Sequence, residues 1–558
     1  MEQQTKKGRG PKSKGGKIAI NVLVMLIVGA LYYYFALPAV NLHASEFYVF
    51  VGVLCVAYFV SALITSGMNL DRNGGVREYF RFIKTQCLPI GILFALLIAV
   101  AIVGSVISMP IFRAGAYRDL LTVETGNFAT DIEEVSYNEI PMLDKDSAER
   151  LGDRKLGELS DMVSQFEVSD GYTQINYLGR PVRVTYLRYG DFFKWLNNRS
   201  EGLPAYIRID MVTQEVDVVR LSDLGLEGIK YSPSELFNRK LERHLRFNYP
   251  TYMFSEPTFE IDENGHPYWV CPKVEMTIGL FGGRDINGAV LMDAITGECA
   301  YFEELPTWVD RVYLAELIME QYDYHGTYVN GFFNSIFGQK EVTVTTSGYN
   351  YIAMNDDVYM YTGVTSVSSD QSNIGFLLSN QRTKETVYYA APGAVEESAK
   401  NSAQGVVQDL GYTATFPLLL NVAGEPTYFM SLKDGSQLVK QYAMVNVAQY
   451  QIVATGVTVA ECESNYLKLL TQSGITKEEE LPQTEVTGVV ADMRTMVVEG
   501  TTYFCIRLQG EETYYSISAA KYPDVITLNT GDRVTIEHQL PAAGGEHRLL
   551  DGYSITIH

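Results

Sequence analysis

Hydrophobic residues are most concentrated in the first 112 positions of the chain. Three apolar runs cover residues 18–37, 47–64 and 88–112, and each holds 18 to 25 residues without a charged side chain. An α-helix rises 1.5 Å per residue and the hydrocarbon core of a bilayer is about 30 Å thick, so each run can cross a membrane as a helix. The sequence therefore predicts three transmembrane helices within residues 18–112.

The charges beside these runs predict their orientation. Lysines and arginines precede the first run and occur between the second and the third, whereas the 38–46 connection has none. Because positively charged loops stay in the cytoplasm, we expect residues 1–17 to form a basic cytoplasmic tail and the three helices to lie in the plasma membrane. The chain then leaves the third helix on the extracytoplasmic side. Cleavage of the first run as a signal peptide is the alternative, and it leaves the C-terminal region on that same side.

The third run carries small residues at four-residue spacing. Gly91, Ala95 and Ala99 form one helix face that another helix can approach closely. Packing against the first two helices and packing against a partner subunit both fit this stripe. The three runs contain no ionisable acidic or basic side chains, which usually mark ion or proton pathways, so a transporter or pump is disfavoured.

Beyond residue 113 helical and strand patterns alternate, which indicates small α+β units in tandem. Two strands flank a tight turn at Asp293 to Glu298, and a matching strand–turn–strand stretch occurs 83 residues earlier, at Asp210 to Glu215. A capping-box pattern predicts a helix from Ser232 to Phe247 in the second copy. We expect α+β units at residues 113–230, 231–340 and 341–480.

The signature Asp293, Thr296, Gly297 and Glu298, preceded by a helix and a hairpin, resembles the PepSY and YpmB-like family of cystatin-like extracytoplasmic domains. The first copy departs from the pattern because Gln214 replaces the glycine. The resemblance implies domains in which a helix packs on an antiparallel sheet. For some relatives it also implies inhibition or regulation of a peptidase.

The last segment, residues 484–558, changes to strand patterns alone. Five strands are expected there, with turns at Glu499–Gly500 and Gly531–Asp532, and their arrangement resembles an OB-fold barrel. The predicted fold class is thus α+β and multidomain. Tandem units of a helix and an antiparallel sheet follow an all-α three-helix transmembrane region, and an all-β barrel ends the chain.

Charge and motif content exclude several classes of function. The net charge is −22, yet residues 1–113 carry +7, so the remainder carries about −29. Such an acidic region is repelled by phosphate backbones, which argues against nucleic acid as a partner. The sequence has no HExxH, GxSxG, Walker or dinucleotide-binding motif, and its seven histidines share no ligand spacing. We expect no enzymatic activity, no cofactor and no metal.

Two further features are candidates for special roles. Cys271 and Cys299 fall in one expected unit, and a disulfide between them and two free thiols are both open. Residues 331–337 form the most unusual apolar stretch outside the membrane runs. Burial in a core is one interpretation, and contact with the bilayer or a partner is the other. The side chains concerned are Phe332, Phe333, Ile336 and Phe337.

Together these features predict a non-catalytic envelope protein. Beyond the lipid bilayer, its expected partner is a protein, a peptide or a component of the cell wall outside the cytoplasm. Regulation or inhibition of an extracytoplasmic peptidase and a structural role in a larger membrane complex are the alternatives. The sequence leaves the ligand and the oligomeric state open.

Overall fold

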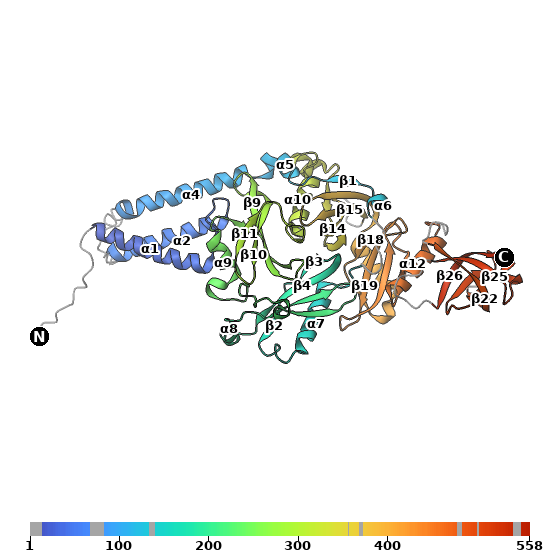
Figure 1. Cartoon of the computed structure of the whole chain (residues 1–558). Helices are drawn as coiled ribbons and strands as arrows, with labels where there is room; N and C mark the ends of the chain where they lie inside the picture. Colours follow the sequence, from blue (N-terminus) through green and yellow to red (C-terminus); the bar gives the residue numbers. More distant parts are fainter. Residues whose placement is uncertain are drawn as a thin grey trace.

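The three apolar runs form helices that lie together at one end of the molecule. The computed structural model describes residues 14–66, 83–132, 140–354, 356–367, 372–476, 483–498, 501–539 and 548–558. Helices α1 (Lys14–Ala36), α2 (Ser45–Ser66) and α4 (Leu88–Ile107) are each long and apolar enough to cross a membrane, as predicted. Figure 1 shows that the rest of the chain extends from the end of this group opposite to the start of α1.

Four α+β units with a common strand order follow the helices. Each unit has a helix, a short edge strand, a hairpin and two further strands. The edge strand and the first hairpin strand both pair with the second hairpin strand, and the later strands continue the sheet on its other side. This repeated order supports an origin by internal duplication, which the two turn motifs indicated.

The first two units follow the predicted order of elements. Unit 1 contains α7 (Lys145–Gly157), β2 (Phe166–Val168), β3 (Thr173–Tyr177), β4 (Arg180–Tyr189), α8 (Phe192–Asn198), β5 (Ala205–Asp210) and β6 (Val216–Arg220). Unit 2 contains α9 (Leu241–Asn248), β7 (Met253–Phe254), β8 (Thr258–Ile261), β9 (Pro267–Ile278), β10 (Gly282–Asp293) and β11 (Cys299–Phe302).

The range 341–480, expected to be one unit, contains the sheets of two. Unit 3 has α10 (Ala315–Thr327), β12 (Thr343–Thr345), β13 (Asn350–Met354), β14 (Asp357–Ser366), β15 (Ser372–Asn380) and β16 (Thr386–Ala394). Unit 4 has α11 (Glu396–Val406), β17 (Thr413–Ala414), β18 (Leu418–Val422), β19 (Glu425–Lys433), β20 (Val439–Asn446), β21 (Val453–Gly456) and α12 (Val459–Gln472). The helix at 315–327 is therefore the first element of unit 3, although it falls within the range 231–340 expected for the second unit.

The segment that follows α4 belongs to unit 3 in space, although residues 113–230 were expected to form the first unit. Helix α5 (Pro110–Arg118) packs on α10, and β1 (Glu124–Gly126) adds to the unit 3 sheet as a parallel neighbour of β16. The chain then passes α6 (Phe128–Asp131) and enters unit 1 near α7. A strand that pairs across more than 250 residues leaves no local signal in the sequence.

The turn between the last two strands is built alike in units 1 to 3. In unit 2 the Asp293 Oδ1 accepts hydrogen bonds from the backbone N–H groups of Ile295 and Thr296, at 2.7 and 2.9 Å. Asp210 makes the same pair of bonds in unit 1 and Asn380 makes it in unit 3. The fifth turn position has a positive φ, and it is held by Gly297, Gln214 and Lys384. The first copy therefore keeps the turn despite its missing glycine.

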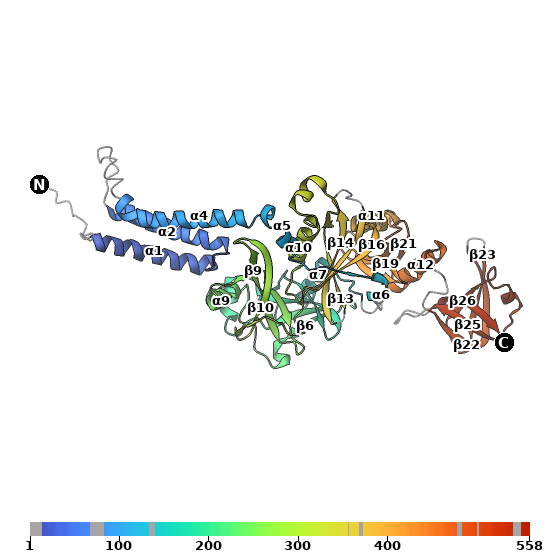
Figure 2. The same cartoon turned by 90° about the horizontal axis from the view of Figure 1, so that it is seen from above.

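The C-terminal segment contains the five predicted strands: β22 (Gln483–Val498), β23 (Thr501–Leu508), β24 (Tyr514–Ser518), β25 (Arg533–Gln539) and β26 (Leu549–Ile557). They pair in the order β22, β23, β24, β26 and β25, and β25 pairs again with β22. A small core of its own fills the space inside, with Val490, Ile506 and Ile536 fully buried. Figures 1 and 2 show this part at the opposite end of the molecule from the three helices.

The units pack in pairs and meet through their hairpins. Units 1 and 2 share one hydrophobic core, which includes Tyr206, Phe259 and Trp269, while units 3 and 4 share another around Phe376 and Tyr428. Strand β3 contacts β8 and β13, and β13 contacts β18, so the four hairpins lie at the centre of the assembly. This central junction positions the site described below.

Unit 2 rests on the ends of the apolar helices. The Arg243 and Arg246 side chains donate hydrogen bonds to the carbonyl oxygens of Tyr34 and Leu37, each at 3.0 Å, where α1 ends. The Ser108 hydroxyl at the end of α4 accepts from the backbone N–H of Leu280, at 2.9 Å. Because these bonds satisfy polar groups that a helix end leaves free, unit 2 is fixed to the helices.

Candidate ligand-binding cavity

A cavity of about 740 Å³ lies where the four units meet. Its walls come from the start of α7, the β2–β3 connection, β4, α9, β8, β9, the start of β13 and Phe416 of unit 4. Small-molecule and peptide sites typically occupy about 300–1,000 Å³ and favour interfaces between domains. The volume and location therefore suit a ligand the size of a few amino acids.

Two buried arginines line this cavity. Arg183 of β4 is 8 % exposed and Arg311, which precedes α10, is 9 % exposed. Burial, together with the charge of Arg311, lowers the pKa of Arg183 to about 10, so the guanidinium remains charged at neutral pH. Neither arginine forms an ion pair with a carboxylate among the residues that the structure describes.

The hydrogen bonds of the two arginines leave part of each guanidinium unused. Arg183 donates from Nε to the Leu143 carbonyl at 3.3 Å, and Arg311 donates from Nη2 to the Tyr351 hydroxyl at 2.7 Å. The Arg311 guanidinium also lies 4.1 Å from the centre of the Tyr351 ring, whereas its buried Nε–H has no acceptor among the described residues. The Asp144 carboxylate acts electrostatically on Arg183, and Arg311 does so on the Glu260 carboxylate. An anion in the cavity would add acceptors for guanidinium N–H groups such as the Arg311 Nε–H.

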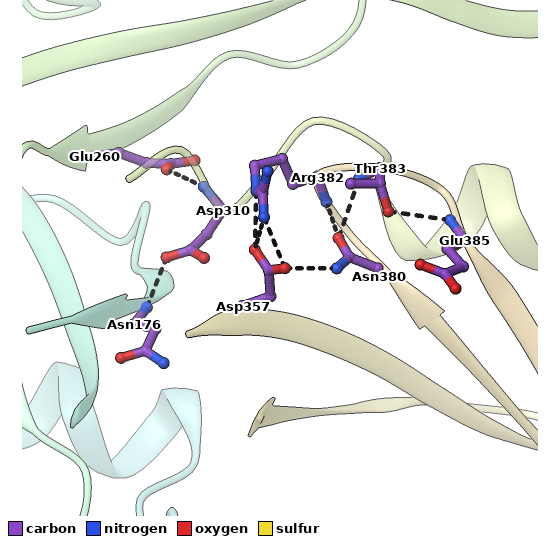
Figure 3. A network of polar contacts seen from close by, with 8 residues as sticks. All are labelled: Asn176, Glu260, Asp310, Asp357, Asn380, Arg382, Thr383 and Glu385. Carbon is purple, nitrogen blue, oxygen red and sulfur yellow. Dashed lines mark hydrogen bonds and ion pairs between the residues drawn. The ribbon is translucent and has the colours of Figure 1, made fainter. Parts of the chain in front are cut away.

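A polar network holds the connection that carries Arg311, and Figure 3 shows its contacts at the preceding residue, Asp310. The Glu260 carboxylate accepts hydrogen bonds from the backbone N–H groups of Asp310 and Arg311, at 2.8 and 3.1 Å. The Asp310 carboxylate in turn accepts from the Asn176 backbone N–H at 2.6 Å. These contacts tie the connection before α10 to β8 of unit 2 and to β3 of unit 1.

Both buried carboxyl groups of this network hold protons more tightly than ordinary carboxylates. Burial raises the pKa of Glu260 to about 7, against its hydrogen bonds and Arg311, which act to lower it. Burial and the neighbouring Glu260 raise the pKa of Asp310 well above its usual value. Both Glu260 oxygens and the Asp310 Oδ2 accept backbone hydrogen bonds, so the network serves to position Arg311, while the buried Asp310 Oδ1 has no partner among the described residues.

A second set of polar contacts in Figure 3 lies at the turn of unit 3. The Arg382 side chain pairs with Asp357 through both carboxylate oxygens at 2.7 Å, and Asn380 donates to Asp357 at 2.8 Å (Figure 3). Asn380 is also the residue whose Oδ1 organises the turn. Asp357 thus helps to fix this turn.

Acidic side chains predominate at the mouth of the cavity. Five exposed carboxylates (Asp146, Asp170, Glu242, Glu256 and Glu316) and one exposed lysine, Lys145, line it, while the buried part of the lining holds the two arginines and the part-buried Asp144. A ligand bearing many negative charges would be repelled there, whereas one with a single anionic end and a cationic or neutral remainder would suit both zones. Among the described residues there is no group of three or more His, Cys, Asp or Glu side chains arranged to hold a metal ion.

The structure places the apolar stretch after α10 at the surface. Phe333, Ile336 and Phe337 are exposed, and Phe332 stacks on Tyr328 with ring centres 6.2 Å apart. Burial in a core, one of the two interpretations, is wrong for these three side chains, because residues 334–338 form a separate turn that projects from the unit. Contact with a bilayer or a partner stays a prediction.

The two candidate cysteines are free thiols. Cys271 lies in β9 and Cys299 in β11, with β10 between them. Neighbouring strands lie about 4.8 Å apart, so residues two strands apart are separated by about 10 Å, beyond the roughly 7 Å limit for a disulfide. Burial raises the pKa of Cys299 to about 11, which makes its thiol unreactive.

The small-residue stripe of α4 is not covered by the first two helices. Gly91, Ala95 and Ala99 are all exposed, and a side chain added at Gly91 would meet no atom within 4 Å. Packing against α1 and α2 is therefore wrong for this face. The described part of the chain leaves it open to lipid or to another helix.

Comparison with known proteins adds no identification. No protein-family model matches the chain, and no curated protein matches its sequence. Among solved structures it is similar to the Bombyx mori GH32 beta-fructofuranosidase BmSUC1, at 11% identity over 73% of this chain and 69% of that one. The TM-score of 0.18 is too low to support any inference about fold or activity.

Proposed function

We propose that the chain is a membrane-anchored, non-catalytic binding protein of a bacterial cell envelope. Its basic N-terminus lies in the cytoplasm, and its four units and terminal barrel lie outside. The ligand is a peptide or another small envelope component with one anionic end, held in the cavity between the units. The PepSY-like turn motifs and the OB-like order of the last strands support a role in recognition.

One observation carries this proposal: two buried arginines line one cavity, and neither forms an ion pair within the part of the chain that the structure describes. Arg183 and Arg311 can form charge-assisted hydrogen bonds with a carboxylate, and the planar guanidinium group is well suited to that geometry. The acidic mouth disfavours polyanions and favours a ligand whose remaining part is cationic or neutral. A peptide with a free C-terminal carboxylate satisfies both conditions.

Calorimetric titration of the full chain in detergent micelles tests this. The probes are a lysyl-alanyl-alanine tripeptide and the same peptide with an amidated C-terminus. We expect the free acid to bind and the amide to bind about 10- to 150-fold more weakly, because charged hydrogen bonds contribute about 1.5–3 kcal/mol. Arg183→Gln should weaken binding similarly, and Arg311→Lys should weaken it less than Arg311→Gln.

Arg188→Gln is the matched control, because Arg188 lies on the same strand but is exposed and pairs with Glu167. It should bind the free acid like the unaltered chain. Equal affinity for the acid and the amide, or unchanged affinity in Arg183→Gln, would contradict the proposed site.

The orientation is tested separately. A tag placed after His558 should be removed by protease added to intact cells whose wall has been stripped. A tag that is cut only after the membrane is broken would place the units in the cytoplasm and refute the envelope role.

A further inference from the structure

Unit 1 exposes a group of large apolar side chains beside the membrane helices. Phe192, Phe193 and Leu196 of α8 and Phe237 of the following unit are 53%, 72%, 43% and 59% exposed. Phe192 and Phe237 both lie against Trp195, with ring centres 5.5 and 5.9 Å away. The four side chains therefore form one continuous surface, named here the aromatic patch.

The outward orientation of the aromatic patch is built into the fold. The buried Glu235 carboxylate accepts hydrogen bonds from the Trp195 indole N–H and the Tyr189 hydroxyl, both at 2.8 Å. The Asp191 side chain caps α8 by accepting from the backbone N–H groups of Phe193 and Lys194. Because Trp195 anchors one face of this short helix, the opposite face must remain outside the core.

A short chain of contacts connects the aromatic patch to the end of α1. The Arg243 guanidinium donates to the Tyr34 carbonyl at 3.0 Å and to the Phe237 carbonyl at 2.6 Å. It also lies 4.1 Å from the centre of the Tyr34 ring. Figure 1 shows α8 and α9 on the side of the units that faces back towards the apolar helices. The single side chain of Arg243 thus links Phe237 to the C-terminal end of α1.

The end of α1 has the composition of a membrane–water boundary. Tyr32, Tyr33, Tyr34 and Phe35 occupy its last turn, and aromatic side chains concentrate at that level of a bilayer. The ring centre of Phe247 in α9 lies 5.6 Å from that of Tyr33. Unit 2 therefore adds an aromatic side chain to those at the end of α1.

Basic residues lie around the aromatic patch, although residues 114–558 carry a large negative net charge. They are Lys194, Arg199, Arg239 and Lys240, of which Lys194 pairs with the exposed Asp191 and Lys240 with the exposed Glu242. Arg199 lies over the Trp195 ring and Arg239 donates to the Arg199 carbonyl at 2.5 Å, which gathers the cations at the patch. Aromatic side chains ringed by lysine and arginine are the composition that interfacial membrane segments use.

We propose that the aromatic patch rests in the headgroup region of the same bilayer that α1, α2 and α4 cross. Phe192, Phe193 and Phe237 enter the boundary between headgroups and acyl chains, and the surrounding cations contact anionic lipid headgroups. The bilayer then supports unit 1 directly, beside the attachment of unit 2 to the helix ends. This contact is independent of any ligand in the cavity.

Quenching by brominated lipids tests the contact in reconstituted vesicles of the full chain. Phe193→Trp places a new fluorophore on the patch, and Ile526→Trp is the matched control, because Ile526 is 73% exposed on the distant barrel. Lipids brominated near the top of the acyl chain should reduce the added emission at position 193 by about twofold, since interfacial segments lie roughly 5–10 Å deep. The tryptophan at position 526 should keep its emission.

The lipid charge is tested in the same vesicles. Adding anionic lipid should increase the quenching at position 193, and Lys194→Glu should reduce that increase. Equal quenching at positions 193 and 526 would overturn the proposal. If quenching at position 193 changes neither with anionic lipid nor with Lys194→Glu, the proposed contact between the basic residues and anionic headgroups is refuted.

Discussion

Asp144 contributes to stability in two ways: it caps the start of a helix, and it forms an ion pair between units 1 and 4. Substitutions at this position can separate the two contributions. Its Oδ1 accepts a hydrogen bond from the Ser147 backbone N–H at 3.1 Å and so caps α7. Its Oδ2 pairs with the Nζ of Lys433, whose side chain is 4 % exposed. Burial opposes ionisation of Asp144, but Lys433 and Ser147 outweigh it and lower its pKa. The carboxylate is thus held charged at the unit 1–unit 4 junction.

The expected loss of unfolding free energy differs between substitutions at this ion pair. Asp144→Asn keeps an N-cap acceptor but leaves the Lys433 ammonium buried without its partner, which costs about 3–5 kcal/mol in comparable pairs. We expect the lower end, about 3 kcal/mol, because the Asp144 side chain is one-third exposed. Asp144→Ala should cost about 1 kcal/mol more through loss of the cap. Lys433→Met should cost less than Asp144→Asn, since the remaining carboxylate reaches water.

Denaturant unfolding of the full chain in micelles, followed by tryptophan fluorescence and by protease resistance, measures these differences. The control is Asp161→Asn, which breaks an exposed pair with Arg220 and should cost at most about 1 kcal/mol. The reasoning fails if Asp144→Asn is no more destabilising than Asp161→Asn. It also fails if Asp144→Asn remains equally harmful in the Lys433→Met background.

Three further changes have definite expected results. Because burial raises the pKa of Glu260 from 4.5 to about 7, the folded chain binds that proton more tightly, and the free energy of unfolding should fall as pH rises from about 4.5 to 7. Glu260→Gln should flatten this slope in melts recorded from pH 5 to 8. Phe337→Ser should change the unfolding free energy by under about 0.5 kcal/mol, where a core phenylalanine would cost about 3–5. Gln214→Gly should raise it by about 0.5–1 kcal/mol in denaturant titrations, because glycine relieves the positive φ; a lower value would contradict the strain.

Local patterns predicted the elements whose cause is local. The three apolar helices, the five C-terminal strands and the turns at Asp210 and Asp293 could all be read from hydrophobic runs and turn residues. The equivalent turn of unit 3 was hidden because Asn380 replaces the aspartate and Lys384 the glycine. Both replacements preserve the turn, since an amide oxygen accepts the same bonds and the backbone keeps its positive φ.

The helix predicted to begin at Ser232 shows how a tertiary contact overrides a local signal. The Glu235 carboxylate, expected to complete a capping box, is taken by Trp195 and Tyr189 of unit 1. The α-helix therefore begins at Leu241. The cavity arginines could not be predicted for a related reason: each stands beside other charged residues in its segment, and they meet only when units 1 to 3 assemble.

The attachment of Arg243 and Arg246 to the end of α1 has a geometric consequence for any membrane-tethered ligand. Because these bonds hold unit 2 to the end of α1, the proposed function implies that the cavity stands at a fixed height above the lipid surface. A ligand anchored in the same membrane must span that height with its own linker before its free end can enter. Linker length thereby becomes a criterion of selection, separate from the chemistry of the end group.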